Sequence, residues 1–158
     1  MTPVLCLAVG LLGQYRAEGF TAQFPGTVAV TKSTVSTGSG QLTGTVYRSG
    51  EGQSVYQVMV TPLSTGVTTG RGALELLDSA RKGAESASQT PAESVQNLLV
   101  DGFPAVRFAL SAANSPKVLH CIVFANGRLY QVTATVGNSD ISKGVAFLGS
   151  FSLSAGAF

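Results

Sequence analysis

Between residues 15 and 61, apolar and polar residues alternate in short runs separated by turn-forming residues. A period of two is typical of β-strands with one buried face. Tyr56, Val58 and Val60, for example, fall on one side of such a strand. The pattern predicts four strands, separated by Pro25-Gly26 and by loops at 36–40 and 49–52, over residues 20–24, 27–35, 41–48 and 54–61.

A change in spacing follows the loop at residues 62–70. Leu77, Ala80 and Ala84 recur at intervals of three and four, as on the buried face of an amphipathic helix. The sequence therefore predicts a helix over residues 71–86.

The last part of the chain repeats this helical spacing. Ile141, Val145 and Leu148 form an apolar stripe that stops at Gly149. Asn138 or Ser139 is the predicted N-cap, because their side chains can accept a hydrogen bond from the first turn. A short strand over residues 151–153 is predicted to close the domain.

Two tight hairpins are predicted between the helices. Asp101-Gly102 separates strands over residues 95–100 and 103–111, and Asn126-Gly127 separates strands over 118–125 and 128–136. Both dipeptides readily adopt the positive φ angles of a type I′ turn.

A two-residue turn fixes the register of the second hairpin, because it pairs Ala125 with Arg128. One face of the hairpin is then wholly apolar and suited to lie under a helix. Its pairs are Val123 with Tyr130, Cys121 with Val132, and Leu119 with Ala134. The opposite face is mixed, which indicates a half-covered or functional surface. Its pairs are Phe124 with Leu129, Ile122 with Gln131, and His120 with Thr133.

The predicted order is four strands, a helix, four strands, a helix and a strand. This order favours an α+β fold in which an antiparallel β-sheet is flanked by two helices. Because no linker composition appears, residues 15–158 are interpreted as a single domain.

Residues 4–12 (VLCLAVGLL) form an unbroken apolar run. The run is too short to span a bilayer, which needs roughly 20 residues, but it matches the apolar region of a signal peptide. We therefore expect residues 1–14 to be a signal peptide and the protein to be extracytoplasmic. The alternative is a buried amino-terminal strand or helix turn. A lipid anchor on Cys6 is disfavoured, because no small residue precedes it.

The composition restricts the class of partner. Hydrophobic residues make up 44% of the chain, charged residues only 11%, the mean hydropathy is +0.30 and the formal charge is +2. Soluble domains carry about 25% charged residues, so the surface is expected to be rich in Ser, Thr and Gly. The basic residues are scattered, with only Arg81 and Lys82 adjacent. A nucleic-acid partner is therefore not expected.

His120 is the only histidine and the first candidate for chemistry. Its predicted neighbours Gln131 and Thr133 suggest a ligand-binding face, whereas the alternative is a strand histidine that hydrogen-bonds across the sheet. Cys121 points to the other face, so a Cys–His nucleophile is disfavoured, and its thiol is expected to be buried and inert. Arg71, in the glycine-rich segment 66–72, is a further candidate for anion binding, with a plain loop as the alternative.

Recognisable catalytic and metal-binding motifs are absent from the sequence. No serine lies in a G-x-S-x-G elbow, and the acids show neither paired nor metal-ligand spacing. We therefore expect no catalytic residue, no metal and no cofactor.

Several short segments together carry a family resemblance: Gly19-Phe20 leading to Phe24-Pro25-Gly26, Tyr56-x-Val58, Leu77-Asp78-x-x-Arg81, Asp101-Gly102-Phe103-Pro104, Arg128-Leu129-Tyr130-Gln131, and Phe147-Leu148-Gly149-Ser150-Phe151. With them the chain resembles small exported bacterial proteins whose domain is similar to PsbP, the extrinsic photosystem II subunit, and to the Ran-binding Mog proteins. The resemblance implies an α/β/α sandwich, binding to partner proteins and no shared catalytic motif. It does not extend to a photosynthetic role, because the charged surface of a photosystem subunit is missing.

Three hypotheses of function follow. The first is a non-enzymatic exported domain that binds a protein partner or small ligand, on the face around His120 and Gln131 or at the loops 62–70 and 112–117. The second is a small hydrolase with His120 as the base and a serine or Asp101 nearby. The third is a structural component of the cell envelope.

Overall fold

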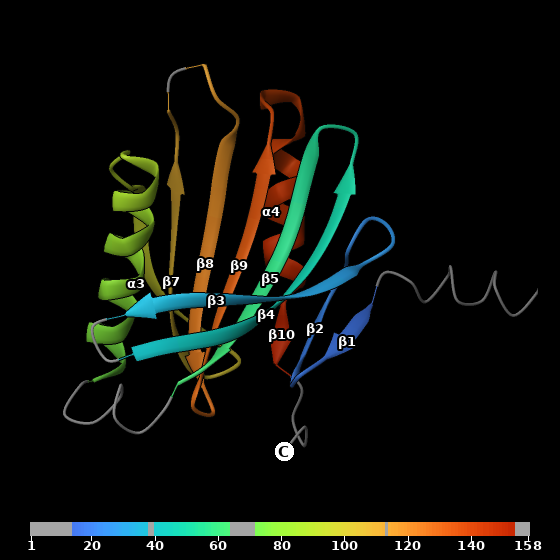
Figure 1. Ribbon diagram of the computed structural model, residues 1–158. Coiled ribbons are helices and arrows are strands. Elements are labelled where there is room, and N and C mark those ends of the chain that lie inside the picture. Colours follow the sequence, from blue (N-terminus) through green and yellow to red (C-terminus); the bar gives the residue numbers. More distant parts are fainter. Residues whose placement is uncertain (1–13, 38–39, 64–71, 113, 154–158) are drawn as a thin grey trace, which may run out of the picture.

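The computed structural model describes residues 14–37, 40–63, 72–112 and 114–153 (Figure 1). In this part of the chain, two antiparallel sheets and two α-helices form an α+β fold. The elements in chain order are β1 (Tyr15–Ala17), β2 (Phe20–Ala22), β3 (Ala29–Thr37), β4 (Gly40–Glu51), β5 (Ser54–Pro62), α3 (Ala73–Ser88), β6 (Glu93–Val100), β7 (Phe103–Leu110), β8 (Lys117–Ala125), β9 (Arg128–Val136), a 3-10 turn (Asn138–Asp140), α4 (Ile141–Ser150) and β10 (Ser152–Leu153).

The main sheet, within the described residues, has seven strands in the order β3-β4-β5-β9-β8-β7-β6. A smaller sheet has the order β1-β2-β10 and unites the two ends of the described chain. The helices pack on opposite faces of the main sheet: α3 lies over β7 and β8, and α4 lies over β9 and β8 (Figure 1). The predicted fold class is therefore confirmed.

Both predicted tight turns are present. Asp101 and Gly102 have φ angles of 51° and 86°, and Asn126 and Gly127 have φ angles of 53° and 73°. These positive values suit the twist of an antiparallel hairpin. The register inferred from the Asn126-Gly127 turn is confirmed at every pair, from Ala125 opposite Arg128 to Leu119 opposite Ala134.

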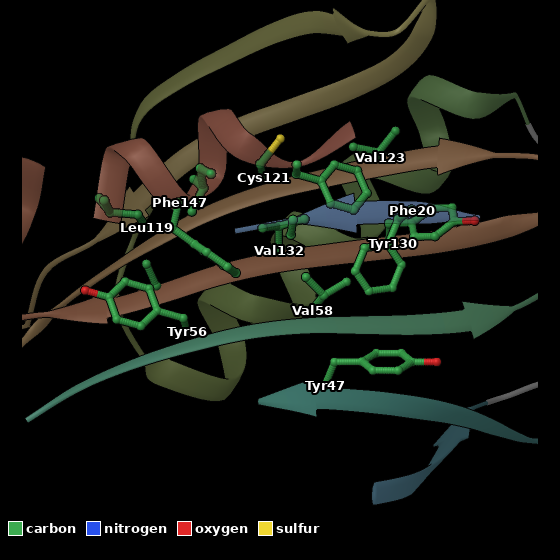
Figure 2. Packing of buried hydrophobic residues seen from close by; sticks show 14 of the residues in the cluster. Phe20, Tyr47, Tyr56, Val58, Leu119, Cys121, Val123, Tyr130, Val132 and Phe147 are labelled. Atoms are coloured by element: carbon green, nitrogen blue, oxygen red, sulfur yellow. The ribbon is translucent and has the colours of Figure 1, made fainter. Parts of the chain in front are cut away.

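The core lies mainly between the main sheet and α4 (Figure 2). Aromatic rings bridge the layers: Tyr56 meets Phe147 with centroids 5.2 Å apart, and Phe20 meets Tyr130 at 6.3 Å. Burial of such side chains contributes roughly 1.5–3 kcal/mol each. The predicted apolar face of the β8–β9 hairpin is this core face, which confirms that it lies under a helix.

A second, smaller cluster joins α3 to the opposite face. Leu77 packs there with Val106, Phe108, Leu110 and Ile122. The mixed face of the hairpin is therefore half covered, as its composition predicts.

The amino-terminal hairpin is attached to the main sheet through one turn residue. Glu18 has a φ angle of 36°, and its backbone oxygen accepts hydrogen bonds from Tyr130 Oη (2.9 Å) and Arg128 Nη1 (3.3 Å). The Glu18 carboxylate accepts a hydrogen bond from Tyr47. Burial, and then this carboxylate, raise the pKa of Tyr47, so its hydroxyl remains protonated as a donor.

Two sequence predictions about turns are wrong. Residues 49–51 extend β4, so the β4–β5 turn consists of Gly52 and Gln53, and residues 36–37 and 40 also belong to strands. These stretches stay extended because each pairs with a neighbouring strand, which outweighs the turn preference of Ser and Gly.

The start of α4 is also different. Asn138 and Ser139 form a 3-10 turn, and the residue at the N-cap is Asp140, whose side chain makes no capping hydrogen bond. Its carboxylate instead accepts a hydrogen bond from Ser54 Oγ at 3.2 Å. The predicted signal peptide (residues 1–14) lies outside the described residues except for Gln14.

Candidate functional site

A row of side chains crosses five strands of the main sheet, on the face that α3 partly covers. Its members are direct cross-strand partners from β4 to β7: Arg48, Gln57, Thr133, His120 and Phe108. Arg48 Nε donates a hydrogen bond to Gln57 Oε1 at 3.1 Å. The row therefore passes from an exposed cation, through two polar side chains, to a buried aromatic ring.

His120 lies where this row passes under α3. Its side chain is only 9% exposed, and its ring stacks on Phe108 with centroids 4.6 Å apart and planes 7° from parallel. Its Nδ1 atom is buried and has no hydrogen-bond partner among the described residues. Burial lowers the pKa of His120 to about 4, so the imidazole is neutral at neutral pH.

Gln131 and Thr133 lie on the same face as His120, two residues apart on β9. Thr133 is the partner of His120, and Gln131 lies between Met59 and Ile122. Both side chains are half-buried. The sheet brings these three predicted site residues together, but their role in binding stays a prediction. Arg71, the fourth, lies outside the described residues.

The part of this face over β4, β5 and β9 is not covered by a described helix, since α3 packs chiefly on β7 and β8. We call it the open face. Its side chains are Val46, Arg48, Val55, Gln57, Met59, Gln131, Thr133 and Thr135. Arg48 is exposed and the other seven are half-buried. Among these residues there is one cation and no acid.

Asp101, one of the groups suggested for a hydrolase, does not lie beside His120. Asp101 Oδ2 accepts hydrogen bonds from Ser152 Oγ (3.0 Å) and from the Leu153 backbone N–H (2.8 Å). Its carboxylate therefore attaches β10 to the β6–β7 turn, whereas His120 lies under α3 on the other side of the main sheet.

Cys121 points away from His120 into the core, as strand alternation predicts. Its side chain is 1% exposed and the cysteine is free. Burial raises the pKa of the Cys121 thiol, and Arg107 opposes this effect through a hydrogen bond and its charge. A thiol with a raised pKa and no access to solvent is a poor nucleophile.

The loops proposed as a second binding region are only partly described. Residues 64–71 lie outside the described part. Around residues 111–117 there is an open hollow of about 520 Å³, lined also by Gly137 and Asn138.

Sequence reasoning missed a cavity of about 200 Å³ on the α4 side of the main sheet. Its walls come from β6, β7, β8 and α4, and they include Gln96, Arg107, Lys117, Leu119 and Leu148. The sequence contains one signal: Arg107 is the single charged residue of the otherwise apolar segment Phe103–Leu110. Only the pairing of β7 with its neighbours places this charge beside Cys121.

No group of three or more His, Cys, Asp or Glu residues suited to hold a metal ion occurs among the described residues. In the same residues, no helix has the length and apolar character to cross a membrane.

The described residues form an α/β/α domain around an antiparallel sheet, and comparison with known proteins identifies its fold. The domain is similar to cyanobacterial PsbP (CyanoP) from Synechocystis sp. PCC 6803, with a TM-score of 0.58 and 16% identity over 89% of this chain and 91% of that protein. The fold is therefore PsbP-like.

A Pseudomonas aeruginosa protein of unknown function matches with a TM-score of 0.42 and 10% identity, over 82% of this chain and 85% of that one. No protein-family model and no curated protein matches the sequence.

Proposed function

We propose that the protein is a non-enzymatic, exported accessory domain that binds a protein partner on the open face. The observation that carries this proposal is a half-covered β-sheet face. Helix α3 covers β7 and β8, while the adjoining surface over β4, β5 and β9 has no described helix on it.

The dimensions of the open face suit one helix of a partner. Neighbouring strands lie about 4.8 Å apart, so three strands present a surface roughly 10 Å wide, close to the diameter of a helix with its side chains. Helix α3 already packs on the adjoining strands in this way. A second helix, supplied by the partner, would lie beside it.

The side chains define the chemistry of that helix. Val46, Val55 and Met59 are half-buried apolar side chains that fit an apolar stripe, and Gln57 and Thr133 can form hydrogen bonds. Arg48 is the only charged side chain of the open face and makes no ion pair among the described residues. We therefore propose an amphipathic helix with a carboxylate opposite Arg48.

The environment of His120 supports a non-enzymatic role. A general base works best when its pKa lies near the working pH and a partner orients it. The pKa of His120 is about 4 because of burial, and its Nδ1 atom has no partner among the described residues.

Site-specific photocrosslinking in the organism that makes the protein tests this function. A photoreactive phenylalanine analogue replaces Met59 on the open face or, as a control, the exposed Ala87 of α3. We expect an adduct of one size from position 59 and none from position 87. The crosslinked peptide should fall in an amphipathic, acid-bearing helix of the partner.

Charge variants make this test specific. Arg48→Glu should abolish the adduct and Arg48→Lys should retain it, because the proposed contact is a charge pair. Arg16→Glu makes the same charge change at an exposed position of β1, outside the open face, and should leave the adduct unchanged. An adduct that persists in Arg48→Glu, or no adduct from a folded protein, would reject docking on the open face.

The proposed export rests on the apolar run at residues 4–12 and is tested separately. Residues 1–14 are fused to alkaline phosphatase, which is active only after it leaves the cytoplasm of a bacterial host. We expect phosphatase activity and loss of the leader. A change of Leu7 and Leu11 to Asp should abolish both, and an inactive wild-type fusion would contradict export.

A further inference from the structure

The cavity of about 200 Å³ beside α4 contains a cation with no acidic partner among the described residues. Arg107 is half-buried in its wall and makes no ion pair among the described residues. Its Nε atom is buried and has no hydrogen-bond partner there, and its guanidinium interacts with the thiol of Cys121. A partly desolvated guanidinium with unused donors is costly, so an anion that entered the cavity would be stabilised.

The other cation of the cavity is already paired. Lys117 Nζ lies 3.3 Å from Glu93 Oε1, and that oxygen also accepts a hydrogen bond from Ser111 Oγ at 3.1 Å. The unmatched positive charge therefore belongs to Arg107. A guanidinium presents a planar set of N–H donors that matches the two oxygens of a carboxylate.

The cavity lies beside an irregularity in the edge strand β6. The pairing of β6 with β7 shifts between Glu93 and Gln96, and Ser94 has a φ angle of 55°. A bulge re-aims the side chains of a strand and is often found beside binding sites. Here Ser94 and Gln96 line the cavity and add hydrogen-bonding groups next to Arg107.

The remaining wall is apolar. Leu119 and Leu148 line the interior, and Val145, which is 52% exposed, lies on the α4 side. The cavity volume equals that of about seven liquid waters, which is smaller than the roughly 300–1,000 Å³ of a drug-sized site. The space suits a carboxylate with a short chain or a single ring.

We propose that this cavity is a binding site for a small organic carboxylate, whose carboxyl group pairs with Arg107 and whose apolar part contacts Leu119, Leu148 and Val145. The site lies on the opposite side of the main sheet from the open face. It is thus independent of the function proposed above.

Titration of the full domain with hexanoate, benzoate and inorganic phosphate, followed by backbone amide NMR shifts, tests the proposal. Both organic acids should bind and perturb amides of β6, β7 and α4. Phosphate should bind at least about tenfold more weakly than hexanoate, because it gains nothing from the apolar wall. Equal affinity for phosphate would overturn the proposed ligand class, and no perturbation by either acid at roughly 10 mM would overturn the site.

Variants separate the two halves of the site. Arg107→Gln should weaken hexanoate binding about tenfold or more, since hydrogen bonds to charged groups contribute roughly 1.5–3 kcal/mol, and Arg107→Lys should weaken it less. Arg16→Gln, at an exposed position of β1, is the matched arginine control and should bind normally. Unchanged binding in folded Arg107→Gln would reject the site.

A second variant keeps the test valid if Arg107→Gln does not fold. Val145→Phe changes an exposed residue of α4 and should be tolerated, but the larger side chain fills the apolar end of the cavity. It should weaken hexanoate more than phosphate. Equal effects on both ligands would contradict the proposed orientation.

Discussion

The imidazole of His120 lies flat against the phenyl ring of Phe108, its cross-strand partner, with 4.6 Å between the ring centroids. This stack holds a titratable ring between the main sheet and α3. Protonation in the folded state would bring a charge next to an apolar cluster, and burial accordingly lowers the pKa of His120 to about 4.

We predict that acid destabilises the protein through this one residue. Between about pH 6.5 and pH 4 the unfolded chain binds a proton at His120 and the folded chain does not, so the free energy of unfolding falls as the pH is lowered. The loss is at most about 3 kcal/mol. Urea unfolding at several pH values in this range measures it.

His120→Phe is the matched variant, because it keeps a ring on Phe108 and removes the titrating group. Since the chain has no other histidine, the difference in pH slope between wild type and variant belongs to His120. The same slope in both proteins would show that carboxylates cause it. At neutral pH we expect the variant to be as stable as wild type, because it also removes the unpaired Nδ1 atom.

A second prediction concerns the contact between the amino-terminal hairpin and the main sheet. Tyr47→Phe removes the hydroxyl that donates to the Glu18 carboxylate and should lower the free energy of unfolding by about 1.5–3 kcal/mol, the range for hydrogen bonds to charged groups. Chemical denaturation measures this change. Tyr15→Phe is the control: its ring packs on Tyr47 and Phe24, and its hydroxyl has no hydrogen-bond partner among the described residues. Equal losses in both variants would mean that Glu18 is not the important partner.

A third prediction compares two helical glycines. A Cβ atom at Gly144 of α4 would lie 2.9 Å from Leu119 Cδ1, 3.2 Å from Val136 Cγ1 and 3.3 Å from Ala134 Cβ, whereas one at Gly83 of α3 would meet nothing within 4 Å. Gly144→Leu should therefore cost about 1–3 kcal/mol through overpacking. Gly83→Leu should raise stability by roughly 0.5–1 kcal/mol, because leucine favours the helix. Thermal unfolding distinguishes the two, and a stable Gly144→Leu variant would show that α4 can move away from the sheet.

The structural predictions from sequence were most accurate where a local signal determines many contacts. Asn126-Gly127 adopts a two-residue turn, and this turn determines every pair of the β8–β9 hairpin, including His120 with Thr133. The alternation of apolar and mixed positions then places one face of this hairpin under a helix. These predictions needed no information from distant parts of the chain.

Other features depend on contacts between segments that are far apart in sequence. Strand β1 has three residues, too few for a period of two to be recognised, and it exists because it pairs with β2 beside Glu18. The cavity at Arg107 requires the irregular pairing at Ser94 and the placement of α4 over β8. The residue pattern of a single strand indicates neither the β1–β2 pairing nor the cavity.

The pairing of β10 with β2 has a consequence for the timing of folding. Ser152 lies opposite Thr21, and Phe151 stacks on Phe20 with centroids 5.7 Å apart, so residues near opposite ends of the described chain complete one sheet. During synthesis, β2 cannot gain its second neighbour until almost the whole domain has left the ribosome. Such late, non-local contacts slow folding and lengthen the lifetime of incompletely folded states. The amino-terminal hairpin is thus made first but completed last.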